Sequence, residues 1–311
     1  MIKDLFFDTL NITEQTAIAC TKIIGNKDQY QADFIAVQEM RKLLNKCNIQ
    51  GTIVIGEGER DQAPMLFIGE NVGLGGISVD IAVDPLEGTK LCAYNQRGAM
   101  SVIAIGDHGT LLNAPDVYMD KIAVGPATPL GVVDLDDTVE NNLANLANFH
   151  KKDISDLKVI VLNRPRHKEL ISRIRKCNAK LKLISDGDVT AVISTSFGAN
   201  RTDLYIGSGG APEGVLAAAA LKTLGGQIMG RLIFENDQQI LRAKTMGLIN
   251  PTKTLYTCDM VKGNVIFAAT AITNSDFLKG IKYTGKNITT ETFMTCSNNQ
   301  QVIIAKREHY E

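Results

Sequence analysis

The sequence has no tryptophan, and aromatic residues make up only 5% of its 311 residues. Proteins that bind single-stranded nucleic acid stack bases on aromatic side chains, so this scarcity argues against such a surface. An excess of charge of one sign is also missing, because the formal net charge at pH 7 is −1. A nearly neutral chain lacks the bulk attraction to nucleic acid or anionic lipid that a basic protein has. We therefore expect neither nucleic acid nor a membrane as a partner.

Cysteine and histidine are few and scattered. The six cysteines contain no Cys-x-x-Cys pair, and the four histidines do not cluster with them. This usage fits a reducing cytosol better than a disulfide framework, and it makes a zinc site of paired Cys and His ligands a poor explanation of the chain.

Long apolar runs are absent as well. The longest, residues 215–221, is too short to span a bilayer. The first residues include Lys3, Asp4 and Asp8 and lack the apolar core of a signal peptide. With 44% hydrophobic and 22% charged residues, the composition is that of an ordinary soluble enzyme, which we expect in the cytoplasm.

An acidic hexapeptide, Asp84-Pro85-Leu86-Glu87-Gly88-Thr89, follows an alternating apolar strand at residues 77–83. Because Pro85 lacks a backbone donor, we expect the strand to end at about Asp84. Two carboxylates within one turn repel each other unless a cation lies between them, and oxygen ligands suit Mg²⁺ and Mn²⁺. The sequence therefore predicts a metal site here. The alternative is an acidic turn in which Thr89 caps the next helix.

Two further acidic features precede the hexapeptide. On a predicted helix at residues 28–45, Asp33 shares a face with apolar residues, so a metal or a basic side chain should accompany it unless the helix dipole suffices. A short strand at residues 51–55 then leads into a glycine-rich acidic loop, Gly56-Glu57-Gly58-Glu59-Arg60-Asp61. Together with the hexapeptide, these carboxylates form a candidate cluster.

The order of elements indicates two parts. The first is strand-rich after two opening helices, of which one is predicted at residues 13–24 with Thr13 as its cap. From about residue 157, strands and helices alternate. We expect an α/β (α+β) fold with two sheets in two domains, a metal-binding domain at residues 1–155 and a substrate-binding domain at residues 156–311.

Two loops in the second part offer polar groups. Arg164-Pro165-Arg166-His167 opens a predicted helix, where basic residues oppose the helix dipole unless an anion binds or they extend into water. Asp186, Gly187 and Asp188 follow the next strand, where they would hold sugar hydroxyls or a metal, or cap the following helix.

A glycine-rich turn at residues 207–214 resembles a dinucleotide-binding loop. The Gly-x-Gly-x-x-Gly pattern started at Gly207 requires glycine at the position of Pro212, so that interpretation fails. We predict instead a backbone-amide nest for a phosphate or hydroxyl, with Glu213 in the first turn of the next helix.

The combined motifs resemble a known family. The hexapeptide at residues 84–89 is similar to the signature of lithium-sensitive, metal-dependent sugar phosphatases. The fuller set resembles the class II fructose-1,6-bisphosphatases of bacteria over nearly the whole chain. That set comprises Ile53-Val54-Ile55-Gly56-Glu57-Gly58-Glu59, Ala63-Pro64-Met65-Leu66, Asn113-Ala114-Pro115-Asp116, Arg164-Pro165-Arg166-His167, Asp186-Gly187-Asp188 and Gly209-Gly210-Ala211-Pro212-Glu213-Gly214.

The resemblance implies a layered αβαβα sandwich with the site between the two domains. It implies that Asp33 and Glu57 bind one metal and that Asp84, Glu87 and Glu213 bind another. It implies catalytic roles for Thr89, Asp61 and Glu59 at the attacking water. The implied substrate-binding residues are Glu87, Gly88, Thr89, Tyr118, Arg164, Pro165, Arg166, Asp186, Gly187, Asp188 and Gly210. Gln29 stands near a position where some relatives have lysine, which removes one expected phosphate contact.

The expected activity is hydrolysis of the 1-phosphate of fructose 1,6-bisphosphate, a gluconeogenic step, with two or more Mn²⁺ or Mg²⁺ ions. A homo-oligomer, dimer or tetramer, is expected for such an enzyme. The alternatives are a related phosphatase acting on sedoheptulose 1,7-bisphosphate or inositol monophosphate, and a nucleotide-binding oxidoreductase built on the Gly207 turn.

Overall fold

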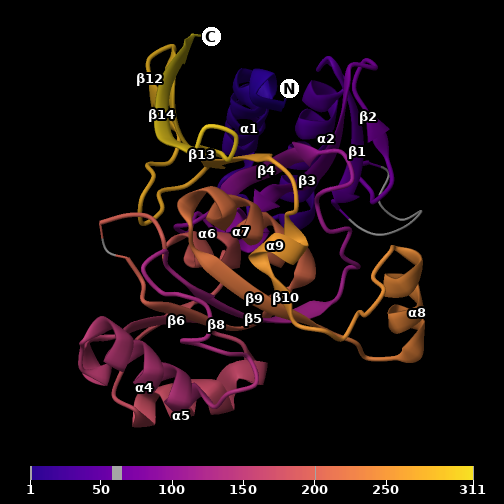
Figure 1. The fold of residues 1–311 in the computed structure, drawn as a ribbon. Coiled ribbons are helices and arrows are strands. Elements are labelled where there is room, and N and C mark those ends of the chain that lie inside the picture. The colour runs from indigo at the N-terminus through magenta and orange to yellow at the C-terminus, as the bar shows by residue number, and fades with distance from the viewer. Residues whose placement is uncertain (1, 58–64, 200, 311) are drawn as a thin grey trace. The chain divides into compact units, whose positions relative to one another are not determined.

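The structure, a computed structural model, describes residues 2–57, 65–199 and 201–310 (Figure 1). Two compact units divide the chain. The first consists of Met1–Asn113 and Val261–Glu311, and the second of Ala114–Met260. The second unit is therefore an insertion in the first. The domain boundary expected near residue 155 lies inside this second unit.

The first unit combines helices with one large sheet. In its described residues the sheet has eight strands in the order β12-β13-β11-β4-β3-β1-β2, with β14 paired to β13. Only the β1–β3 pair is parallel among these described pairs. The helices are η1 (Ile2–Leu5), α1 (Phe6–Cys20), η2 (Thr21–Ile23), α2 (Gln29–Leu44) and α3 (Thr89–Ala93). The strands are β1 (Ile49–Ile55), β2 (Asn71–Val72), β3 (Ile77–Glu87), β4 (Met100–Asp107), β11 (Val265–Ala271), β12 (Lys282–Thr284), β13 (Asn287–Cys296) and β14 (Gln301–Tyr310).

The first long helix differs from its prediction. It begins at Phe6 rather than at Thr13, and Thr13 is fully buried in its middle. The Thr13 hydroxyl donates to the carbonyl of Leu10 at 3.0 Å and accepts from the hydroxyl of Thr270 on β11 at 2.8 Å. Thr13 therefore packs α1 onto the sheet instead of capping it. A threonine that satisfies its hydroxyl in this way is compatible with a helix interior.

Strand β3 continues past the residue at which the sequence predicts its end. It runs to Glu87, although Pro85 cannot donate to a ladder. Its pairing with β4 shifts between Asp84, opposite Val102, and Glu87, opposite Met100. Pro85 lies in this irregularity, where an interrupted ladder tolerates the missing donor. The ladder between β3 and β4 is therefore interrupted after Asp84 and resumes at Glu87.

The second unit has three layers (Figure 1). Its six described strands run in the order β10-β9-β5-β8-β6-β7, with α4 and α5 on one face of the sheet and α6, α7 and α9 on the other. Strands β6, β7 and β8 are mutually parallel, whereas β5, β9 and β10 join them by antiparallel pairing. The helices are α4 (Val139–His150), η3 (Ile154–Asp156), η4 (Pro165–His167), α5 (Lys168–Lys176), α6 (Asp188–Ile193), α7 (Ala211–Leu224), α8 (Asp237–Thr245) and α9 (Thr257–Met260). The strands are β5 (Tyr118–Val124), β6 (Lys158–Leu162), β7 (Lys180–Ile184), β8 (Leu204–Gly210), β9 (Gln227–Ile233) and β10 (Leu255–Tyr256).

The glycine-rich segment is part of a strand rather than a loop. Residues 207–210 pair in register with β5, from Gly207 opposite Lys121 to Gly210 opposite Tyr118, and α7 begins at the next residue. The backbone nest predicted for these residues is therefore wrong, because the pairing with β5 keeps them in extended ladder geometry. Side chains explain the glycines instead, since a Cβ at Gly209 would overlap the Asp188 carboxylate and crowd Lys121.

Each unit has its own apolar core. In the first, residues of α1 and α2 such as Leu10, Met40 and Leu44 pack on β1, β3 and β4. In the second, α4 and α5 pack on β5, β6 and β8 through Leu143, Leu146 and Ile174. The mixed α/β class with two sheets is confirmed. Among the described residues, no helix has both the length and the apolarity needed to cross a bilayer.

Candidate active site

The irregular end of β3 brings two predicted metal ligands together. A carboxylate oxygen of Asp84 lies within 4.8 Å of one of Glu87. Glu87 is buried and Asp84 half-buried, and the Asp84 carboxylate accepts a hydrogen bond from the Leu86 amide at 3.2 Å. Two negative groups this close and this shielded from water repel each other strongly. A hard divalent cation would relieve that repulsion, and an all-oxygen donor set suits Mg²⁺ or Mn²⁺.

Asp33 and Thr89 also meet within the first unit. Asp33 is half-buried on α2, and burial raises the pKa of its carboxyl, while a hydrogen bond from the Thr89 side chain partly offsets the rise. Thr89 begins α3 directly after Gly88, whose φ of +81° is readily adopted only by glycine. The Thr89 hydroxyl also lies 3.1 Å from the carbonyl of Leu86. The partner of Asp33 identified here is therefore a hydroxyl, not the basic residue that the sequence left open.

Glu57 follows β1, and its amide donates to the carbonyl of Leu66 at 2.9 Å. Gly56 is required beside it, because a Cβ there would overlap that same carbonyl. The backbone around Glu57 is therefore fixed by a close approach of two chain segments. Glu59 and Asp61, predicted at the attacking water, lie outside the described residues.

In the second unit, Arg166 is held on three sides. Its Nε donates to the carbonyl and hydroxyl of Ser208, both at 3.1 Å, and its Nη2 donates to the same carbonyl at 2.7 Å. Its guanidinium lies 4.5 Å from the ring centroid of Tyr118, within the range of a cation–π contact. Within the described part of the chain no acceptor pairs with Nη1. A cation positioned in this way suits a phosphate oxygen.

Arg164 lies near another predicted substrate residue. Its Nη2 is 3.6 Å from Asp186 Oδ1, and both side chains are about one-third exposed. Gly187 follows in the left-handed conformation, with φ +87°, and places Asp188 at the first position of α6. The two carboxylates of the loop therefore lie near different cations, Asp186 near Arg164 and Asp188 near Lys121.

Asp188 forms a buried ion pair with Lys121, a residue that sequence reasoning did not assign to the site. Lys121 on β5 is 1% exposed. Its ammonium also donates to the carbonyl of Gly210 at 2.9 Å, and the Tyr205 hydroxyl donates to Asp188 at 3.3 Å. A buried charge is costly unless it is paired and hydrogen-bonded, and these contacts satisfy that requirement.

Glu213, in the first turn of α7, has an unusual environment. Burial raises the pKa of its carboxyl to about 7, the Asp188 carboxylate adds to the rise, and Lys121 opposes it. Its Oε2 is shielded from water, and among the described residues no donor pairs with it. A Cβ at Gly210 would overlap this oxygen. An orphaned carboxylate oxygen with space reserved for it fits a metal ligand.

His167 and Ser208 form a second group that the sequence did not single out for a role. His167 Nδ1 lies 2.7 Å from the Leu162 carbonyl, and its Nε2 accepts from the Ser208 amide at 2.8 Å. These contacts fix the segment that carries Arg166. The sequence signal was weak, because nothing local links His167 to a serine on another strand.

The predicted residues therefore fall into groups within each unit. The first unit brings Asp84 close to Glu87 and Asp33 close to Thr89. The second unit pairs Tyr118 with Arg166 and Arg164 with Asp186, and it places Gly210 between Lys121 and Glu213. Pro165 opens the short helix η4 between the two arginines.

Comparison with known proteins gives a consistent result over the whole chain. Residues 3–309 match the family described as bacterial fructose-1,6-bisphosphatase, glpX-encoded. The chain is 43% identical to fructose-1,6-bisphosphatase 1 class 2 of Escherichia coli K12, over 100% of this chain and 96% of that protein. It is 44% identical to D-fructose 1,6-bisphosphatase class 2/sedoheptulose 1,7-bisphosphatase of Prochlorococcus marinus MIT 9515, over 91% of this chain and 89% of that one. The protein of the same description in Synechococcus elongatus is 40% identical, over 96% and 94%.

Proposed function

Because the chain belongs to the family of bacterial, glpX-encoded fructose-1,6-bisphosphatases, we propose that it hydrolyses the 1-phosphate of fructose 1,6-bisphosphate. The products are fructose 6-phosphate and inorganic phosphate, so the enzyme is a phosphoric monoester hydrolase of gluconeogenesis. The observation that carries the proposal is the close pair of shielded carboxylates, Asp84 and Glu87, at the irregular end of β3.

Divalent metal ions, Mg²⁺ or Mn²⁺, are part of the proposal. We assign Asp33 and Glu57 to one ion and Asp84, Glu87 and Glu213 to another. The shielded pair on β3 and the orphaned oxygen of Glu213 support this assignment, since the pair brings two carboxylates close together and Glu213 Oε2 has no donor among the described residues. When bound, such ions lower the pKa of water and neutralise charge on phosphate oxygens.

Side chains of the protein then orient the attacking water and accept its proton. Water attacks phosphorus, the bond from phosphorus to the sugar oxygen breaks, and the leaving oxygen takes up a proton. Thr89 is held at the start of α3 and contacts Asp33, so its hydroxyl can orient the attacking water. Asp61 and Glu59 are proposed to share in accepting the water's proton.

Substrate recognition is assigned to the second unit together with the segment at residues 87–89. Arg166, fixed by Ser208 and Tyr118, supplies a rigid positive charge for a phosphate. Asp186 and Asp188, with Gly187 and Gly210 between and beside them, supply acceptors for sugar hydroxyls. Arg164 adds the second positive charge that a bisphosphate requires.

The decisive experiment measures phosphate release from fructose 1,6-bisphosphate, sedoheptulose 1,7-bisphosphate and inositol monophosphate, each with Mg²⁺, Mn²⁺ or no metal. We expect fructose 1,6-bisphosphate to be preferred and activity to require metal. Asp84→Asn and Glu87→Gln should nearly abolish turnover, whereas Glu39→Gln, which removes a half-buried carboxylate on α2 that pairs with Lys42, should leave it intact. Full activity in excess EDTA would contradict the proposal.

A second candidate substrate is sedoheptulose 1,7-bisphosphate. Relatives 40–44% identical carry both activities in their names. The Arg164 and Arg166 pair suits any sugar with two phosphates, so the same site could accept the longer chain. Comparing kcat/KM for the two sugars decides the question. By contrast, an NAD titration should show no saturable binding, because Pro212 occupies the position where the dinucleotide pattern needs glycine.

Oligomeric state and location complete the proposal. We propose a cytoplasmic homodimer or homotetramer, as is common for metabolic enzymes. Light scattering coupled to size-exclusion chromatography gives the mass, and a monomeric mass at micromolar concentration would contradict it. Fractionation of the source cells tests the location.

A further inference from the structure

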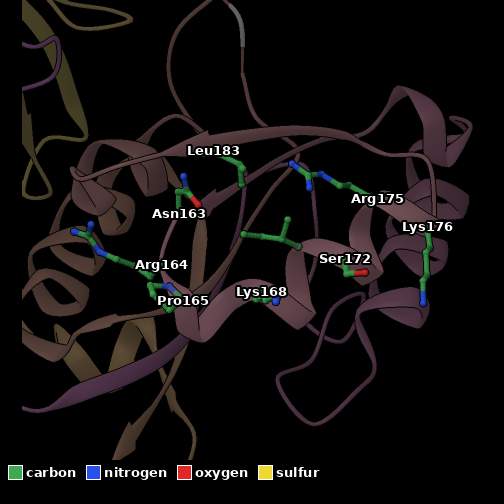
Figure 2. Close-up of a pocket in the computed structure, with 9 residues that line it drawn as sticks. Asn163, Arg164, Pro165, Lys168, Ser172, Arg175, Lys176 and Leu183 are labelled. Carbon is green, nitrogen blue, oxygen red and sulfur yellow. The ribbon is translucent and has the colours of Figure 1, made fainter.

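A pocket of about 880 Å³ lies beside α5 in the second unit (Figure 2). Pockets that hold small molecules measure about 300–1,000 Å³. Its floor is apolar, from Pro165, Ile171 and Leu183, and Asn163 and Ser172 add neutral polar groups. Four cations complete the lining, which are Arg164, Lys168, Arg175 and Lys176. No acidic residue is among these nine.

This concentration of positive charge is local, because the whole chain has a net charge of −1. It is also uncompensated at two positions. Among the described residues, no carboxylate pairs with Lys168 or Arg175, whereas Arg173, on another face of α5, is paired with Glu140. The ion pair of α5 thus goes to Arg173, whereas Lys168 and Arg175 at the pocket have no carboxylate partner among the described residues.

The helix dipole explains only part of this pattern. Cations in the last turn are favourable, which accounts for Arg175 and Lys176. Lys168 lies in the first turn and Arg164 precedes the helix, where the same dipole disfavours positive charge. The pocket is cationic at both ends of α5, although the helix dipole favours cations only at the C-terminal end. An anionic ligand therefore explains the positive charge better than the helix dipole does.

The spacing defines the ligand further. Lys168 and Arg175 are seven residues apart on one face of α5, which corresponds to about 10 Å along the helix axis. Figure 2 shows Arg175 extending toward Leu183 across the apolar floor, while Arg164 points away from it at the other end. A ligand that uses the pocket therefore carries several negative charges and an apolar or flat part that covers Ile171 and Leu183.

We propose that this pocket, which we call the α5 pocket, binds a small organic phosphate at a site separate from the one that hydrolyses the substrate. Arg166, the anchored cation of the substrate site, is not part of its lining. Arg164 and Pro165 belong to both, so a ligand in the α5 pocket would contact two residues of the substrate site. The proposal does not depend on which sugar phosphate the enzyme hydrolyses.

The test uses ATP in the presence of EDTA, because its triphosphate supplies the charge and its adenine the flat apolar part. Isothermal titration calorimetry compares the wild type with Arg175→Gln/Lys176→Gln. The matched control is Arg242→Gln/Lys244→Gln, which removes one arginine and one lysine from the last turn of α8 in the same unit. A third protein, Arg166→Gln, tests binding at the substrate site.

We expect one site per chain, weakened at least about tenfold in Arg175→Gln/Lys176→Gln, since two charge-assisted hydrogen bonds are lost. The α8 control and Arg166→Gln should bind within about twofold of the wild type. Both pocket residues are exposed, so urea unfolding should be unchanged. Three outcomes overturn the proposal: no saturable binding in the wild type, equal loss in the two double variants, or loss in Arg166→Gln.

Discussion

Lys121 is a buried cation that neutralises the buried carboxylate of Asp188. It is 1% exposed and compensates Asp188 while donating to the Gly210 carbonyl. We expect Lys121→Met to destabilise the protein by about 3–5 kcal/mol, because Asp188 then remains buried and unpaired. Urea unfolding measures the change.

The double variant Lys121→Met/Asp188→Leu distinguishes stability from function. It should recover much of the lost stability, because two apolar groups replace a buried ion pair. Activity should stay low, because Asp188 no longer offers an acceptor to the sugar. Recovery of activity together with stability would show that the pair serves folding alone.

The lowered pKa of buried His167 should make the stability of the protein depend on pH. Burial lowers the pKa of its imidazole, and the neighbouring Arg166 and Arg164 lower it further, against the Leu162 carbonyl and Asp120, which raise it. The unfolded chain therefore binds the proton first as the pH falls. The stabilisation is complete above about pH 6.5 and is lost as the pH decreases below that value.

Urea unfolding at pH 7.5, 6.5 and 5.5 tests this effect. His167→Gln should show a shallower decline of stability over this range than the wild type. His167 Nε2 accepts a hydrogen bond from the Ser208 amide, so protonation of Nε2 would place its N–H opposite the amide N–H and break that bond. An identical pH profile in the two proteins would exclude His167 as the titrating group.

Thiol reactivity follows from burial. All six cysteines are free, and Cys258 is the exposed one. Burial raises the pKa of Cys47 and of Cys92 to about 11, which suppresses their thiolates at neutral pH. We expect a maleimide at pH 7.5 to label Cys258 first, and peptide mapping by mass spectrometry identifies the site. Early labelling of Cys92 would contradict the packing around α3.

Helices α2 and α8 begin with equivalent side-chain caps, but only one of them carries a proposed site residue. The Asp28 side chain accepts from the Gln31 amide at 2.9 Å at the start of α2, and Asn236 accepts from the Gln239 amide at 3.0 Å at the start of α8. Asp28→Ala and Asn236→Ala should each cost about 1 kcal/mol of helix stability. Only α2 carries a proposed metal ligand, Asp33, near its capped end.

We therefore expect Asp28→Ala to lower the apparent affinity for metal, seen as a higher Mn²⁺ concentration for half-maximal rate. Asn236→Ala should leave that concentration unchanged. If both variants shift it equally, the effect reflects general stability and not the placement of Asp33.

Local sequence predicted some elements well and others poorly. The prediction for α2 was close because a cap and an apolar stripe coincide at its start. The end of β3 was misplaced because Pro85 lies in a bulge, and the bulge depends on pairing with β4. The extension of β8 through Gly210 was missed for a similar reason, since β5 pairs with these glycines and side chains fill the space beside them.

Most carboxylates of the site were identifiable because they stand in short motifs after strands, and Asp33 because it shares a face of α2 with apolar residues. Lys121 was not, because its partner Asp188 is distant in sequence and nothing near it on β5 indicates an ion pair. The insertion of one unit into the other was also invisible, since the pairing of β4 with β11 joins residues on either side of it.

The second unit is formed by one continuous segment, whereas the first unit is formed by two segments that flank it in the sequence. The insertion begins and ends beside the isolated bridge between Leu111 and Val261, where the Lys262 amide donates to the Thr110 carbonyl at 2.9 Å. The Asp80 carboxylate accepts from the amides of Thr110 and Leu111 and fixes one side of this junction. Residues 114–260 should therefore fold as an isolated fragment, with cooperative thermal unfolding and dispersed amide resonances.

This arrangement has a consequence for synthesis on the ribosome. When residue 260 has been made, the inserted unit is complete, but β4 still lacks its neighbour β11, and its unpaired edge is buried in the finished sheet. Until residues 261–311 emerge, the nascent protein carries an open, apolar strand edge of the kind that recruits other chains. A premature stop near the end of the coding sequence should therefore yield aggregates that contain a correctly folded inserted unit.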